Sequence, residues 1–390
     1  MNKLDFDNFA RMQVMSLPDM GPVQVAECFG DKLTNLLSTG EIAGIDTIVI
    51  TGCGDSYAAS LAFQPTVERS TGCRVLAPRA VEFTRFVTSA DLIDPKKTLV
   101  IGISTGGSTA RVVEVLKKAN EIGAISLVIT NGPDSICAGT AKHTLVLGTP
   151  EFPNDFPGLR SYVGSLVGIL AVTALIGKEK GVLPKTAIAD WSKAIAAYIE
   201  SYRHIMDKID DQIFALSSKY SPCETYDFLG DGVEYASAFF GGAKFLECGG
   251  ILCSWDDTED WCHVGYFLKN PETVGTVFSV DKHAPDWSRV LETVGSAHKI
   301  GRPVLVVSNA DKSAFPEGVD VCTLPDAAPG YEFLLPLMDH IPATLLAGYV
   351  ATMQNIPFFR RTFLPDGQPD PENPWKTSMT IRNSKLEIHA

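Results

Sequence analysis

The feature that most constrains the fold is a pattern of strand, turn and helix that occurs twice along the 390-residue chain. Residues 46–58 (DTIVITGCGDSYA) and 226–236 (YDFLGDGVEYA) each combine a short apolar strand, a G-x-G turn and a helix start. Later elements follow in step, because KTLVIGIS (97–104) has its counterpart in ETVGTVFS (272–279). A helix, a further strand and a closing apolar helix also correspond. Such ordered self-similarity indicates a duplicated domain.

The fold class follows from the elements within each repeat. Apolar strands of four to seven residues, separated by amphipathic helices, are typical of parallel sheets covered on both faces. We therefore predict an α/β protein of two tandem doubly wound, flavodoxin-like domains. The predicted boundaries are an N-terminal helical extension over 1–44, a first domain over 45–215, and a second domain with a C-terminal tail over 216–390.

Composition excludes several classes of function. The net charge of −13 and the pI near 5.0 argue against a nucleic-acid surface, which needs clustered Lys and Arg. The N-terminus has no apolar signal core, and Asp339 and His340 interrupt the apolar segment 333–351, which predicts a buried helix. We therefore expect a cytoplasmic protein without a membrane span.

Nine cysteines without a CxxC pair predict reduced thiols.

Three loops of the first half carry the residues expected to bind a ligand. They are TGCGDSY (51–57), ISTGGSTA (103–110) and TNGPDSICAGT (130–140), and each follows a strand. Ligands of open parallel sheets bind where strands end and helices begin. Backbone N–H groups and hydroxyls at a helix N-terminus form an anion cradle without a basic side chain. The predicted phosphate and sugar contacts are Gly54, Ser56, Ser104, Thr105, Gly106, Ser108, Thr109 and Ser135.

The hydroxyls of these loops also have interpretations that involve no phosphate. Ser and Thr commonly cap helices, which needs no ligand. The second half, however, has SVDKHAPD (279–286) in place of the STGGST loop. A helix start at this position of the repeat therefore does not by itself require the STGGST sequence. The loop lacks the Gly-Lys-Ser/Thr ending of a nucleotide-binding P-loop, and Tyr57 replaces the third glycine of a dinucleotide fingerprint. We therefore expect no nucleotide cofactor.

With these motifs together, the chain resembles the sugar isomerase (SIS) domain family from about residue 45 onward. The arrangement is similar to the tandem pair in the isomerase half of glucosamine-6-phosphate synthase. GCGDSY resembles that family's CGTSY loop, ISTGGSTA its SQSGETA loop, and NGPDS its NVPGSS turn. The family's Gln and second Ser become Thr105 and Gly106 here, so part of the ligand must be bound differently.

The resemblance also implies a catalytic set in the second half. GGAKFLECGGILCSWDDTEDWCH places Lys244, Glu247 and His263 at the family's Lys-x-x-Glu and Glu-to-His spacing. In the family, the His opens the sugar ring and the Glu moves a proton between C1 and C2. Lys244 and Glu247, at i and i+3, share one helix face. Without the resemblance, the preferred interpretation of Lys244 and Glu247 is a solvated ion pair, and that of His263 is a structural residue.

The cysteines beside His263 raise the question of a metal. Cys248, Cys253 and Cys262 have spacings that fit no common structural zinc pattern, so we expect no metal. The acidic run DDTED (256–260) suits either a solvated loop, the preferred interpretation, or the cationic part of a lysine-bearing substrate.

The family's C-terminal imine-forming lysine has only an approximate counterpart. Aligning SMTI with the family's SVTV places Thr377 at the lysine's position and Lys376 one residue earlier. Imine chemistry by Lys376 therefore stays open.

The resemblance leads to an expected function with alternatives. The chain begins Met1-Asn2, unlike a glutaminase with Cys at position 2, so we expect ring opening and C1/C2 proton transfer without glutamine. The leading expectation is a deaminase or isomerase of a 6-phosphorylated amino sugar such as glucosamine 6-phosphate. A deglycase of a fructosamine 6-phosphate and a non-catalytic sugar-phosphate sensor are the alternatives. Relatives imply a homodimer with shared active sites, in which His263 serves the neighbouring subunit.

Overall fold

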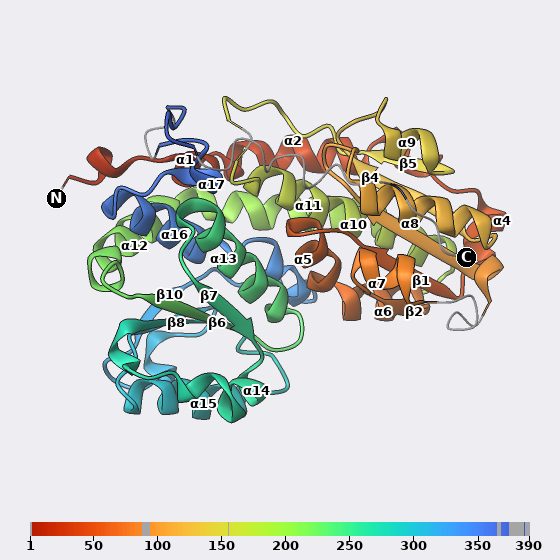
Figure 1. The fold of residues 1–390 in the computed structure, drawn as a ribbon. Helices are drawn as coiled ribbons and strands as arrows, with labels where there is room; N and C mark the ends of the chain where they lie inside the picture. The colour runs from red at the N-terminus through yellow and green to blue at the C-terminus, as the bar shows by residue number, and fades with distance from the viewer. Residues whose placement is uncertain (1, 88–93, 155, 365–367, 374–385, 387–390) are drawn as a thin grey trace. The chain divides into compact units, whose positions relative to one another are not determined.

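The computed structural model describes residues 2–87, 94–154, 156–364, 368–373 and 386 (Figure 1). It contains two five-stranded sheets, and every strand pair in both is parallel. In sequence order, each sheet places its second strand at one edge, then its first, third, fourth and fifth strands. This confirms the predicted duplication and the doubly wound α/β class.

The first sheet has the order β2-β1-β3-β4-β5. Its strands are β1 (Thr47–Thr51), β2 (Arg74–Leu76), β3 (Thr98–Ile103), β4 (Ile125–Thr130) and β5 (His143–Val146). Their helices are α5 (Asp55–Ala62), α6 (Gln64–Thr71), α7 (Ala80–Arg85), α8 (Ala110–Glu121), α9 (Ile136–Thr140), α10 (Leu159–Glu179) and α11 (Ala187–Ser201). Val49 and Val100 pack with α7 and α8, whereas Ile129 faces Gly168 of α10, so helices cover both sides.

The second sheet has the order β10-β9-β8-β6-β7. Its strands are β6 (Thr225–Leu229), β7 (Cys253–Asp256), β8 (Val274–Val280), β9 (Val304–Ser308) and β10 (Asp320–Thr323). Its helices are α12 (Met206–Tyr220), α13 (Glu234–Gly249), α14 (Thr258–His263), α15 (Trp287–Lys299), α16 (Ile341–Met353) and α17 (Phe358–Arg361). Phe228 packs beneath α13 while Leu229 packs with α14 and α15 on the opposite face (Figure 1).

The residues before β1 are mostly helical. They form α1 (Phe9–Met15), α2 (Leu17–Phe29), α3 (Asp31–Thr34) and α4 (Thr39–Gly44), after a short 3-10 turn. They divide between the two compact units of the chain. The first-sheet unit comprises the described residues of 19–151, 160–197 and 378–390, and the second-sheet unit those of 1–18, 152–159 and 198–377. The domain boundaries stated above stay a prediction, because compact packing does not follow the chain in consecutive blocks.

Among the residues that the structure describes, two helical segments are long and apolar enough to span a membrane by length and composition alone. They are Leu159–Glu179 and Glu332–Met353, and in each the most apolar window is 94% buried within the protein. The second contains the predicted buried segment 333–351, which the structure divides into a 3-10 turn and α16. Such burial is typical of the core helices of doubly wound proteins.

Candidate functional site

The three predicted ligand loops lie together at one edge of the first sheet. They follow β1, β3 and β4, which are adjacent and parallel, so their carboxyl ends meet. Backbone bonds join two of the loops directly, because the Thr105 carbonyl accepts from the Asn131 N–H (2.9 Å) and the Thr130 hydroxyl (3.1 Å). The Gly107 carbonyl accepts from the Cys137 N–H at 2.9 Å. The predicted proximity of these loops is confirmed.

Glycine allows the closest approach between these loops. Gly107 has φ of +66°, and a Cβ built there would lie 2.0 Å from the Ser135 hydroxyl oxygen. No larger residue fits this backbone conformation or this space. Gly54, at the start of α5, also has positive φ (+58°).

The hydroxyls at this edge differ in what they do. Ser104 is buried, and its hydroxyl donates to the Thr109 hydroxyl at 3.1 Å. Thr109 stands at the start of α8 without a side-chain capping bond, so capping does not explain it. Ser135 does cap a helix, because its oxygen accepts from the Ala138 N–H at 3.3 Å. Ser56 and Thr105 are half-buried, and Gly106 and Ser108 are exposed.

This edge can bind an anion. The first N–H groups of a helix have no partner within that helix, and α8 begins at Ala110, directly after the STGGST loop. Those N–H groups and the hydroxyls of Ser104 and Thr109 together supply neutral donors near a positive helix end. The loops therefore have the chemistry of a phosphate cradle.

Two arginines at this edge were missed by the sequence analysis. Arg111, in the first turn of α8, pairs with Glu114 at 2.9 Å, and its charge partly offsets the burial that raises the pKa of Cys53. Arg79, after β2, lies over the Tyr57 ring at 4.5 Å. The position of Arg111 one residue after the STGGSTA motif was the available signal.

The equivalent edge of the second sheet is acidic. Asp231 accepts from the Thr258 N–H (2.7 Å) and hydroxyl (2.6 Å), and Asp281 accepts from Asn309 Nδ2 (2.9 Å). Burial and a hydrogen bond to Asp231 raise the pKa of Asp286 to about 6. These carboxylates, which follow β6 and β8, disfavour a phosphate there.

Lys244 and Glu247 lie on one face of α13, as predicted. Lys244 is fully buried, and its ammonium donates to Glu247 Oε2 (2.5 Å) and to the Pro157 carbonyl (2.6 Å). It also lies 4.4 Å from the centre of the Phe240 ring. The Glu247 side chain keeps 28% exposure. The pair therefore combines a buried ammonium with a partly exposed carboxylate, and it is not a solvated ion pair.

Burial keeps a neighbouring histidine neutral. His340 is fully buried, and burial, together with the charge of Lys244, lowers the pKa of His340 to about 3. A neutral His340 adds no second positive charge beside Lys244.

His263 ends α14 and faces solvent. Its side chain is 70% exposed, and its Nε2 lies 3.0 Å from Glu259 Oε1. His263 and Glu247 thus lie on different helices and have different hydrogen-bond partners. Lys376 lies outside the described residues.

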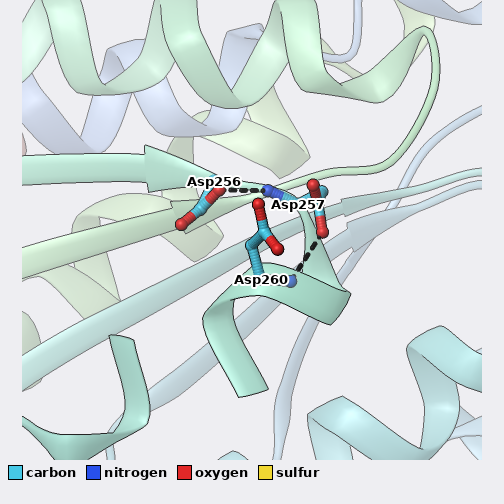
Figure 2. A group of neighbouring side chains, drawn as sticks. All are labelled: Asp256, Asp257 and Asp260. Atoms are coloured by element: carbon cyan, nitrogen blue, oxygen red, sulfur yellow. Dashed lines mark hydrogen bonds between the residues drawn. The ribbon is translucent and has the colours of Figure 1, made fainter. Parts of the chain in front are cut away.

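The acidic run next to α14 forms a local cluster. Asp256, Asp257 and Asp260 have carboxylate oxygens within 4.8 Å of one another (Figure 2). Asp257 caps α14 by accepting from the Glu259 N–H (2.9 Å) and Asp260 N–H (2.8 Å), and Asp256 accepts from the Asp257 N–H (3.0 Å). Two of the three carboxylates thus stabilise the start of a helix, which is a sufficient role for this cluster.

Comparison with known proteins finds a similarity to one domain family in the first half of the chain. Residues 41–176 match the family model "SIS domain". Among curated proteins, the chain is 28% identical over 335 residues to a glutamine–fructose-6-phosphate aminotransferase (isomerizing) from Xanthomonas campestris. That match covers 84% of this chain and 52% of the relative, so the chain spans about half the length of the curated relatives it matches.

Solved structures share the fold across both halves. The C-terminal domain of glucosamine-fructose-6-phosphate aminotransferase from Francisella tularensis has a TM-score of 0.79 at 20% identity, covering 92% of this chain and all of that one. Tagatose-6-phosphate ketose/aldose isomerase from Escherichia coli has a TM-score of 0.72 at 16% identity, covering 94% and 97%. Glucosamine-6-phosphate deaminase from Thermotoga maritima has a TM-score of 0.64 at 16% identity, covering 89% and 96%.

Proposed function

Because residues 41–176 match the SIS domain model and the second sheet repeats the topology of the first, we propose that the protein is a phosphosugar enzyme. Its substrate is a 6-phosphorylated amino sugar of the glucosamine-6-phosphate type. The reaction opens the sugar ring, moves a proton between C1 and C2, and releases or moves the amine without using glutamine. We expect it to take place in the cytoplasm.

The observation that carries this proposal is the cradle at the first sheet. Three adjacent strand ends supply hydroxyls and helix N–H groups, and Gly107 lets two loops approach closely. A phosphate dianion is the common anion that uses such neutral donors. The phosphate fixes the substrate, so that C1 and C2 can be presented to a base.

Glu247 is the proposed base. Its carboxylate is partly exposed, while the buried Lys244 ammonium fixes its orientation. Proton transfer between C1 and C2 requires an ionised carboxylate of this kind. His263 is the proposed ring-opening residue, as the family resemblance implies.

The surroundings of His263 support a homodimer with shared active sites. The chain after His263 exposes large apolar side chains, namely Val264 and Phe267 at about 70% each. Exposed apolar clusters of this kind mark protein interfaces. We propose that a second copy of the chain covers this segment and receives His263 in its own site.

A fructosamine-6-phosphate deglycase is the second candidate. The two arginines of the first-sheet edge, Arg79 and Arg111, favour it, because guanidinium groups bind the carboxylate of an amino-acid substituent. A simple amino sugar has no such group.

A substrate panel tests the proposal. The full chain is incubated with glucosamine 6-phosphate and with fructoselysine 6-phosphate, and ammonia, lysine and hexose phosphate are quantified. Ammonia release or isomerisation with the first substrate supports the leading proposal, and lysine release from the second supports the deglycase. Binding of both without turnover would contradict an enzyme and favour a sugar-phosphate sensor.

A further inference from the structure

A buried ion pair lies inside the second sheet. Asp227 is a residue of β6, and Arg302 precedes β9; both are almost completely inaccessible to solvent. Arg302 Nη1 donates to Asp227 Oδ2 and to the Thr276 hydroxyl (3.3 Å), and the Ser254 hydroxyl donates to Asp227 Oδ1 (2.6 Å). Burying an ion pair costs desolvation free energy unless further hydrogen bonds satisfy both groups. The other hydrogen-bond partners of Asp227 and Arg302 therefore indicate what the pair does.

Asp227 and Arg302 also form hydrogen bonds with residues on both sides of His263 in the sequence. The Trp261 indole N–H donates to Asp227 Oδ2 at 3.0 Å, two residues before His263. Arg302 Nη2 donates to the Gly265 carbonyl at 2.9 Å, two residues after it. The Arg302 guanidinium carbon also lies 5.0 Å from the centre of the Trp261 ring.

Packing restricts the same short segment. Trp261 is buried in the core between β6, β8 and α15. A Cβ at Gly265 would lie 2.4 Å from Trp261 Cδ1, so the chain turns back tightly on the indole. His263 therefore projects into solvent from a backbone that is fixed at both flanking positions.

We propose that Asp227 and Arg302 are positioning residues that hold His263 in the geometry for opening the sugar ring. This inference rests on the proposed function, because it assigns the purpose of the pair through His263. Neither residue contacts the substrate. A purely structural pair would stabilise the fold equally for every substrate, whereas a positioning pair affects the ring-opening step alone.

The test compares a ring-closing substrate with its 5-deoxy analogue. The 5-hydroxyl closes the ring of both glucosamine 6-phosphate and a fructosamine 6-phosphate, so the 5-deoxy analogue of the substrate that the full chain turns over cannot form that ring. Trp261→Phe removes the indole bond to Asp227 while keeping an aromatic ring in the core, and Arg302→Lys keeps the charge but cannot span both partners. We expect each to lower kcat/KM for the ring-closing substrate by about 10- to 100-fold. Turnover of the analogue should stay within about twofold of the unmodified chain.

Matched controls and His263→Ala separate the outcomes. Trp287→Phe, which changes another tryptophan that packs against the same core, should leave both activities unchanged. The positioning role is overturned if Trp261→Phe and Arg302→Lys lower both activities equally, or lower neither, while His263→Ala loses only the ring-closing activity. Full activity of His263→Ala would overturn the role of His263 in the proposed function and this inference with it. If Arg302→Lys fails to fold, Trp261→Phe alone decides.

Discussion

The carboxyl edges of the two sheets have the same strand topology and opposite chemistry. Hydroxyls, glycines and a helix start follow β1, β3 and β4, whereas in the second sheet Asp231 follows β6, and Asp281 and Asp286 follow β8. The first edge suits a phosphate, and the second repels one. Glu247, the proposed base, belongs to the second half, whose own strand ends carry aspartates instead of a cradle of hydroxyls.

This difference indicates how the two halves of a duplicated fold can take different roles. The strands and helices are constrained by a shared core, so they stay alike, while the loops at the strand ends are free to change. In our account one half binds the phosphate and the other supplies proton transfer. The following changes test that division.

The largest effect is expected at the base. Glu247→Gln should lower kcat by about 10²- to 10⁴-fold, because the amide cannot accept a proton, while binding of the sugar phosphate stays nearly unchanged. Steady-state kinetics and calorimetric titration measure the two quantities. The matched control is Glu292→Gln, whose side chain is 69% exposed, and it should be fully active. A fully active Glu247→Gln would refute the base assignment.

A methyl group at Gly107 should damage the cradle. Gly107→Ala introduces a Cβ that collides with Ser135 and disfavours the positive φ, so we expect sugar-phosphate binding to weaken by roughly 100-fold. Gly232→Ala is the control, because Gly232 also has positive φ (+56°) but its Cβ meets nothing within 4 Å. Equal effects of the two variants would show that the first edge has no special role.

Removing one hydroxyl should have a smaller effect on binding. Ser104→Ala should weaken sugar-phosphate binding by about tenfold, which matches the loss of one hydrogen bond to a charged group. Ser279 occupies the corresponding position at the end of β8, and Ser279→Ala should leave the dissociation constant unchanged. Weaker binding in Ser279→Ala alone would reverse the assignment of the two edges.

The smallest effect is expected on the pH dependence of the unfolding free energy, through Asp339 of the second half. Burial, with the charge of Asp281, raises the pKa of Asp339 to about 7. The folded chain thus keeps a proton that the unfolded chain releases above about pH 4. This contribution to the unfolding free energy is complete below pH 4 and is lost as the pH rises through 7.

Urea unfolding at several pH values between 4 and 8 measures this slope. Asp339→Asn should flatten it, because the amide does not titrate. Asp311→Asn, at an exposed carboxylate, should leave the slope unchanged. An unaltered pH dependence in Asp339→Asn would contradict the assignment.

The fold and the location of the cradle could be predicted from the sequence. Apolar runs between turn residues identified the strands, and parallel topology then required the three loops to meet. The start of α8 at Ala110 followed from the hydroxyl-rich loop before it. These features depend on local pattern and on the geometry of parallel sheets.

Long-range contacts could not be predicted. The burial of Lys244 depends on the Pro157 carbonyl, 87 residues earlier, and the clash at Gly107 depends on a loop that follows another strand. The Asp227–Arg302 pair left one signal, an aspartate inside the apolar strand YDFL, because a charge in a buried strand requires a partner. Nothing in the spacing identified that partner.

The most direct test of the division between the halves is a crystal structure with a bound hexose 6-phosphate. Our account predicts phosphate density within hydrogen-bond distance of Ser104, Thr109 and the first N–H groups of α8. Density at the Asp231–Asp281 edge instead, or a cradle left empty by a sugar phosphate that binds elsewhere, would contradict it.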